Sequence, residues 1–125
     1  MNFLNYDAMS LGNHDLEMPQ EKLIWRMKES SFPWLGANVQ QDLEHSNHSL
    51  RLDPYKVLER NGVRIGILGM TIPEIPIWLD YPNLKGFSFQ DILSSSRKWV
   101  SVLKNEEKVD LLIGFFHSGG DMDFD

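Results

Sequence analysis

The chain has 125 residues, 42% of them hydrophobic and 24% charged, which is enough for one globular domain with a single core. The net charge of −6 argues against a nucleic-acid-binding surface, because neutralising phosphates requires clustered Lys and Arg. The absence of cysteine excludes disulfides and thiolate zinc sites.

The first part of the chain is predicted to place a polar loop between a short strand and a helix. Residues 7–11 form the strand, and Gly12 permits a tight turn in which a side chain would collide. Pro19 is favoured in the first turn of a helix. The apolar stripe of that helix is Leu23, Ile24 and Met27, with Trp25 beside it.

Residues 34–39 are predicted as one short buried strand, and residues 40–53 as a polar, irregular segment. His45 and His48 in that segment have the i, i+3 spacing of a metal half-site on a helix. The segment has little apolar support for a helix, so a solvated loop is favoured.

A β-hairpin is predicted next. Residues 55–59 and 63–70 are its strands, and Asn61-Gly62 is a strong type I′ turn sequence. Residues 71–86 contain prolines that remove ladder donors, so a long loop is expected there.

Ser88, with Asp91 three residues later, predicts a capped helix. Residues at helical spacing form its core face: Phe89, Ile92, Trp99, Val100 and Leu103. Residues 109–116 then form a buried strand that delivers His117, followed by Ser118-Gly119-Gly120, at its C-terminal end. The acidic residues 121–125 lack the pattern of a calcium loop and favour a solvated terminus.

Two loops therefore share one pattern, a strand followed by a small-residue turn that carries a histidine. The first loop offers Asn13, His14, Asp15 and Glu17, and the second offers His117. In α/β proteins the C-terminal ends of strands open onto a common crevice. A single histidine after a strand is usually structural or merely exposed, whereas two in this pattern favour a functional site.

Gly12-Asn13-His14-Asp15 resembles the Gly-Asn-His-Asp/Glu block of the calcineurin-like metallophosphoesterases, and is similar to their branch of 5′-nucleotidases and 2′,3′-cyclic-nucleotide phosphodiesterases. The resemblance continues in order through five further segments, so it spans essentially the whole chain. These segments are residues 6–11, 34–39, 55–58, 63–69 and 110–119.

The resemblance implies an α/β fold, a partial α/β/β/α sandwich of mixed sheet and flanking helices in which the N- and C-terminal strands are missing. Residues 1–125 would be the central portion of the catalytic domain. It also implies that Asn13 and His117 ligate the same metal. His14 would stabilise the transition state or protonate the leaving oxygen, with Glu17 as its carboxylate partner in place of the Asp common in this branch.

Two divalent metal ions are implied as cofactors, and Mn, Fe, Zn, Co and Ca all suit oxygen and imidazole ligands. The implied substrate is a phosphorylated small molecule such as a nucleotide, not a nucleic acid polymer. The branch is commonly periplasmic or secreted, although residues 1–6 show no signal peptide. No apolar run approaches the roughly 20 residues that cross a bilayer, so no membrane association is expected.

Three family motifs do not occur here: the upstream Asp-x-His and Gly-Asp-x-x-Asp loops and the downstream Gly-His-x-His loop. The chain is therefore expected to be a central slice of the domain, inactive or weakly active by itself. We expect it to bind divalent metal weakly and to self-associate through exposed sheet edges. The alternative is a non-catalytic α/β binding or assembly module that retains Asn13, His14 and His117 as relics.

Overall fold

The computed structural model describes residues 1–42, 52–79 and 81–119. His45, His48 and residues 121–125, which the sequence analysis considered as metal ligands, lie outside these ranges. The elements in order are η1 (Asn2–Leu4), β1 (Met9–Ser10), η2 (Asn13–Glu17), α1 (Gln20–Glu29), β2 (Trp34–Leu35), β3 (Val39–Gln41), β4 (Leu52–Asp53), β5 (Tyr55–Arg60), β6 (Val63–Thr71), α2 (Ile75–Trp78), α3 (Tyr81–Leu84), β7 (Phe87–Phe89), α4 (Ile92–Asn105) and β8 (Leu111–His117). In the described part of the chain, the helices are too short or too polar to span a bilayer.

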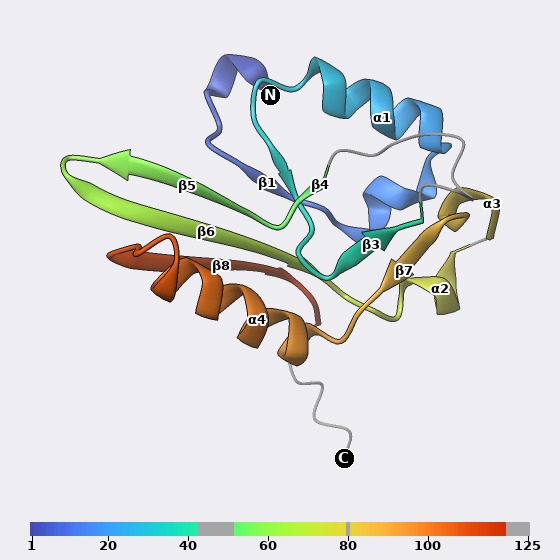
Figure 1. Cartoon of the computed structure of the whole chain (residues 1–125). Helices are drawn as coiled ribbons and strands as arrows, with labels where there is room; N and C mark the ends of the chain where they lie inside the picture. Colours follow the sequence, from blue (N-terminus) through green and yellow to red (C-terminus); the bar gives the residue numbers. More distant parts are fainter. Residues whose placement is uncertain (43–51, 80, 120–125) are drawn as a thin grey trace.

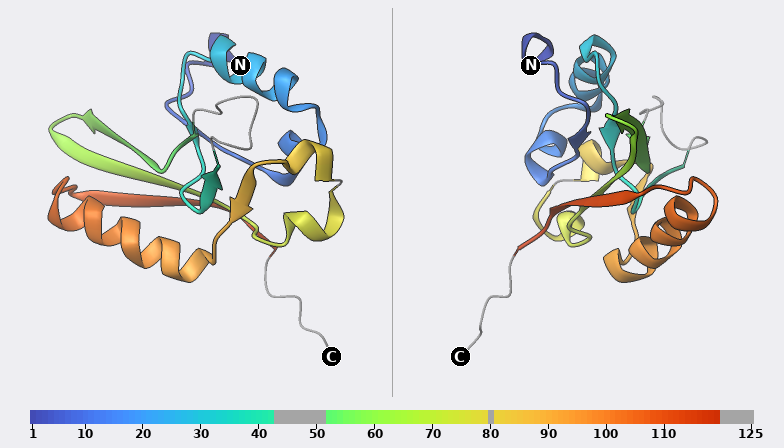
Figure 2. Two further views of the ribbon diagram at one scale, coloured as in Figure 1. Left: turned by 45° about the vertical axis from the view of Figure 1, so that its right-hand side comes forward. Right: turned by 90° about the vertical axis from the view of Figure 1, so that its left-hand side faces the viewer.

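Two three-stranded sheets pack between two helices (Figure 1). Strands β1, β2 and β4 run parallel in the first sheet. In the second, the central strand β6 is antiparallel to β5 and parallel to β8. Helices α1 and α4 lie on opposite sides of the molecule, α4 along the second sheet, in each view (Figure 2). This α/β/β/α arrangement confirms the predicted fold class.

Three clusters of buried side chains correspond to the three contacts between layers. Leu23 of α1 packs with Trp34 and Leu16 outside the first sheet. Ala8, Leu35 and Ile67 fill the space between the two sheets, and Leu103 of α4 packs on Leu68 and Met70 of the second sheet. The α1 stripe is therefore core as predicted, while Trp25 beside it is 62% exposed.

Gly69 of β6 allows the two sheets to approach closely. A Cβ atom on Gly69 would lie 2.3 Å from Leu35 Cβ and 3.1 Å from the Leu35 carbonyl carbon. The main chains meet here, since the Ala37 N–H donates to the Gly69 carbonyl over 2.7 Å. A side chain at position 69 would push the first sheet away from the second.

The predicted hairpin is confirmed. Strands β5 and β6 pair from Arg60↔Val63 to Tyr55↔Leu68. Asn61 and Gly62 join them with φ angles of 52° and 77°. Both angles are positive, as a type I′ turn requires, and Asn and Gly tolerate this conformation best.

The single strand predicted over residues 34–39 is wrong, because the chain changes sheet within it. Trp34 and Leu35 belong to the first sheet, whereas β3 pairs with β7 in a separate two-stranded sheet. The buried Asn38 side chain explains the break. It accepts from the Thr71 N–H and donates to the Thr71 carbonyl, over 3.0 and 2.8 Å, beyond the point where β5 stops pairing with β6.

The loop predicted over residues 71–86 instead contains α2 and α3. Pro76 lies in the first turn of α2, where a missing N–H breaks no helical hydrogen bond. The helix predicted from Ser88 begins after Asp91, whose Oδ1 accepts from the Ser94 N–H over 2.7 Å. Phe89 is therefore not on the helix face; it lies in β7, paired with Val39.

Strand β8 forms where predicted, but it is not buried. Leu111, Phe115 and Phe116 are 48%, 40% and 51% exposed. Within the described residues, β8 is an edge strand that pairs only with β6. Because β8 has a neighbouring strand along one edge only, part of its side-chain surface stays accessible to solvent. The hydrophobic sequence of a strand alone therefore does not predict that it is buried.

Candidate metal and phosphate site

The ends of β1 and β8 bring the two predicted loops together. Asn13 is separated from the end of β1 by two residues, Leu11 and Gly12, and His117 is the last residue of β8. Asn13 Oδ1 and His117 Nε2 are 2.7 Å apart, although 104 residues separate them in the sequence. The two strand ends that meet here belong to two different sheets, and not to one sheet as the sequence analysis expected.

Gly12 supports this contact in a way that the sequence did not predict. Its φ of −109° and ψ of 167° are accessible to any residue, so the backbone turn does not require glycine. A Cβ atom at Gly12 would instead lie 3.2–3.3 Å from Cε1, Nδ1 and Nε2 of His117. Three ring atoms at nearly equal distance mean that the imidazole lies flat over Gly12.

The contact between Asn13 and His117 also defines which ring nitrogen carries the proton. An amide oxygen can only accept, so His117 Nε2–H is the donor to Asn13 Oδ1. His117 is exposed, and Asn13 is partly buried. The two atoms that face each other are both of a kind that binds divalent cations once the proton is removed.

His14 and Glu17 form a second pair within η2. His14 Nδ1 donates to Glu17 Oε1 over 2.6 Å. In a 3₁₀ helix, which has three residues per turn, positions i and i+3 are eclipsed, and this places the two side chains together. Their side chains are 79% and 50% exposed, so the pair contributes little to stability and acts mainly to orient the imidazole.

Residues other than the four predicted to bind metal or act on phosphate hold η2 in place. Asp15 Oδ2 accepts from the Gly12 N–H over 2.9 Å, and Leu16 is buried in the core. Asn83 donates to the Glu17 carbonyl, and Gln20 donates to the Asn83 carbonyl. Asn83 lies 66 residues beyond Glu17, and no local sequence pattern could have linked the two.

Asn13 and His117 fit a divalent ion by donor type. An amide oxygen and an imidazole nitrogen suit Mn, Fe, Zn or Co. In the described part of the chain, no group of three or more His, Cys, Asp or Glu side chains could hold a metal ion. A stable site takes about four or more ligands. Asn13 and His117 are therefore too few by themselves to complete such a site.

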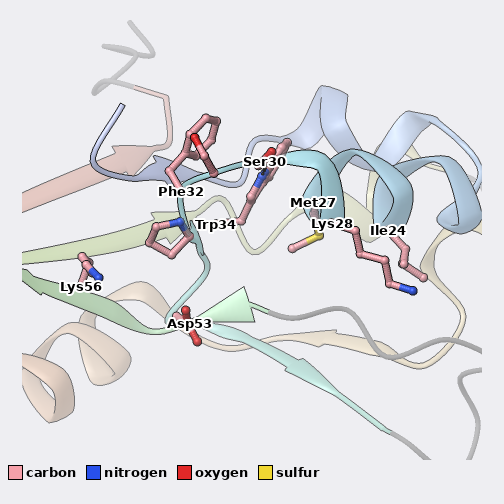
Figure 3. Close-up of a pocket in the computed structure, with 10 residues that line it drawn as sticks. Ile24, Met27, Lys28, Ser30, Phe32, Trp34, Asp53 and Lys56 are labelled. Carbon is pink, nitrogen blue, oxygen red and sulfur yellow. Dashed lines mark hydrogen bonds between the residues drawn. The ribbon is translucent and has the colours of Figure 1, made fainter. Parts of the chain in front are cut away.

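A pocket of about 620 Å³ lies elsewhere in the structure (Figure 3). Its lining side chains come from α1, from the segment between α1 and β2, and from the strands β2, β4 and β5. They include Lys28, Asp53 and Lys56. None of the four predicted site residues lines it. The candidate site is thus an exposed surface at the strand ends, and its identification rests on the side chains that meet there.

No family model matches the chain. It is 30% identical over 119 residues to a 5′-nucleotidase of Vibrio cholerae and 39% identical over 126 residues to a human 5′-nucleotidase. These matches cover 95% and 98% of the chain. The crystal structure of the calcineurin-like phosphoesterase YfkN from Bacillus subtilis matches 97% of the chain, with a TM-score of 0.80 and 33% identity. The match covers 37% of that structure.

Fold and sequence together define an α/β/β/α domain of the metallophosphoesterase class. Over nearly its whole length the chain is similar to 5′-nucleotidases and to a calcineurin-like phosphoesterase, as the sequence resemblance predicted. It spans about a fifth of the length of the first curated relatives it matches, 21% in each case.

Proposed function

We propose that this chain forms part of the catalytic site of a dinuclear-metal phosphoesterase that hydrolyses nucleotides or related phosphate esters. The observation that carries the proposal is the 2.7 Å contact between Asn13 and His117 at converging strand ends. It supports the role that the family resemblance implies, in which both residues hold one divalent ion. Such ions offset phosphate charge and activate water at neutral pH.

His14 is the residue proposed to act on the phosphate. Its Nδ1–H is held by Glu17, so Nε2 is the nitrogen left for a substrate. A protonated Nε2 can donate to a phosphoryl oxygen or give its proton to the leaving oxygen. Glu17 acts through His14 by keeping the ring in one orientation, and its 2.6 Å contact supports the proposed pairing despite the longer side chain.

Hydrolysis of bis(p-nitrophenyl) phosphate by the chain with Mn²⁺, together with calorimetric Mn²⁺ binding, tests the proposal. Asn13 and His117 are too few by themselves to complete such a site, so we expect weak binding and low activity. Asn13→Ala and His117→Ala should abolish both. Asn105→Ala is the matched control, because Asn105 lies at the end of α4 and bonds only to Ser101 Oγ among the described residues.

Three outcomes are informative. Mn²⁺-dependent activity that both site variants lose, and that the Asn105→Ala protein retains, supports the proposal. Binding without any hydrolysis favours a non-catalytic binding module. Binding that persists unchanged in both site variants refutes the roles given to Asn13 and His117.

A further inference from the structure

Thr71, the last residue of β6, carries a buried hydroxyl without a hydrogen-bond partner among the described residues. The residue is fully buried, at 0% exposure. A buried hydroxyl that is left unpaired destabilises the folded state, because it has lost its hydrogen bonds to water. The lack of a partner for Thr71 Oγ1 therefore calls for an explanation.

The position of Thr71 places this hydroxyl beside the candidate site. Thr71 pairs with His117 in the parallel register of β6 and β8, so their side chains are neighbours on one face of the sheet. That face is the one toward the first sheet, because Ile67 and Gly69 on the same face meet Leu35. His117 contacts Gly12, which follows β1 of the first sheet, from this face.

The backbone of Thr71 is firmly held. The Asn38 side chain bonds both its N–H and its carbonyl, and all three of these groups are buried. The backbone at the strand end is therefore fixed, and with it the face of the sheet on which the Thr71 side chain lies. That face also carries His117.

We propose that Thr71 is a positioning residue for His117, its hydroxyl accepting the Nδ1–H of the ring when Nε2 binds a divalent ion. A neutral imidazole carries one proton, which Nε2 now donates to Asn13. If Nε2 supplies its lone pair to the ion, that proton resides on Nδ1. Metal-binding histidines almost always donate their second ring N–H to an acceptor. Thr71 Oγ1 is the unpaired acceptor on the neighbouring strand.

This inference rests on the proposed function, and Zn²⁺ titrations of the whole chain test it. Zn²⁺ is diamagnetic, so ¹⁵N-edited imidazole spectra report both its affinity and the position of the His117 ring proton. The key variant is Thr71→Val, which removes the hydroxyl and keeps the shape. Ser96→Ala is the matched control, because Ser96 Oγ on α4 is also buried and unpaired among the described residues.

We expect Thr71→Val to raise the urea midpoint of the metal-free protein, because an unpaired buried hydroxyl is removed. The same variant should weaken Zn²⁺ binding about tenfold and lose the protected Nδ1–H resonance of the bound state. Thr71→Ser should restore both. Ser96→Ala should leave Zn²⁺ binding unchanged.

An unchanged Zn²⁺ affinity in Thr71→Val overturns the role of Thr71, and leaves the proposed function standing if Asn13→Ala and His117→Ala still weaken binding. A lower urea midpoint in Thr71→Val overturns it as well, since the hydroxyl would then have a structural partner. If the unmodified chain binds no Zn²⁺ at millimolar concentration, the proposed metal site and the role of Thr71 both fall.

Discussion

We expect Gly12→Ala to change the packing of the His117 ring while leaving the stability of the fold nearly unchanged. The added Cβ would lie 3.2–3.3 Å from three ring atoms. Reaching the ~3.5 Å at which such contacts are favourable moves the ring by about 0.3 Å. The His117–Asn13 contact of 2.7 Å must then lengthen or tilt.

The expected cost to folding is small. The φ and ψ of Gly12 suit alanine, and replacing glycine at a compatible position stabilises by about 0.4–1 kcal/mol. This gain offsets most of the crowding against an exposed ring that can move. Metal ligands, in contrast, must lie within about 0.2 Å of their ideal distances. We expect Zn²⁺ binding to weaken about tenfold, which is about 1.4 kcal/mol.

Calorimetric Zn²⁺ titration and urea unfolding of the same samples provide the assay. Gly119→Ala is the control, because a Cβ at Gly119 meets no atom of the described residues within 4 Å, although Gly119 lies two residues beyond His117. Unchanged Zn²⁺ affinity in Gly12→Ala would refute the reasoning. Equal losses of affinity and stability would also refute it, because they would show a general disruption of the loop.

Three further variants test other parts of the structure. Gly69→Ala places a Cβ 2.3 Å from Leu35 Cβ, and we expect it to lower the free energy of unfolding by about 1–3 kcal/mol or more. Hydrogen bonds from Ser94 lower the pKa of Asp91, so its stabilisation is present above the unfolded-state pKa and is lost as the pH falls through the folded-state value. Asp91→Ala should therefore lower Tm at pH 7 and approach the unmodified protein in acid. Phe115→Lys should reduce the self-association that we expect at the exposed edge strand β8, as measured by light scattering.

For each of these predictions, a specific result would contradict the reasoning. Gly69→Ala with an unchanged urea midpoint would show that the sheets can separate freely. Asp91→Asn keeps a capping oxygen and should retain most of the stability. A Tm difference between Asp91→Ala and the unmodified chain that is independent of pH would rule out the carboxylate. A monomeric unmodified chain would exclude association through β8.

Sequence patterns predicted the elements whose stability is local. The Asn61-Gly62 turn needs only two residues that tolerate positive φ, and the hairpin forms as predicted. The apolar stripe of α1 and the strand that ends at His117 were also correct. The errors occur where long-range contacts decide. Asn38 ends β2 by bonding to Thr71, and Phe89 joins β7 because Val39 is there to pair with it.

In the candidate site too, some features follow from the local sequence and others from long-range contacts. The residue types and their order were enough to single out Asn13, His14, Glu17 and His117, and the family resemblance that relates them. The i, i+3 pairing of His14 and Glu17 is likewise encoded locally, once η2 is a 3₁₀ helix.

Only the tertiary structure decided how these residues meet. Gly12 leaves room for a ring 105 positions away, whereas its own backbone angles suit any residue. The sequence does not distinguish Thr71, because threonine is common in strands. Its unpaired hydroxyl and its register with His117 appear only when β6 and β8 are assembled. Chemistry-bearing residue types are visible in a sequence, whereas burial, register and close approach are properties of the packed layers.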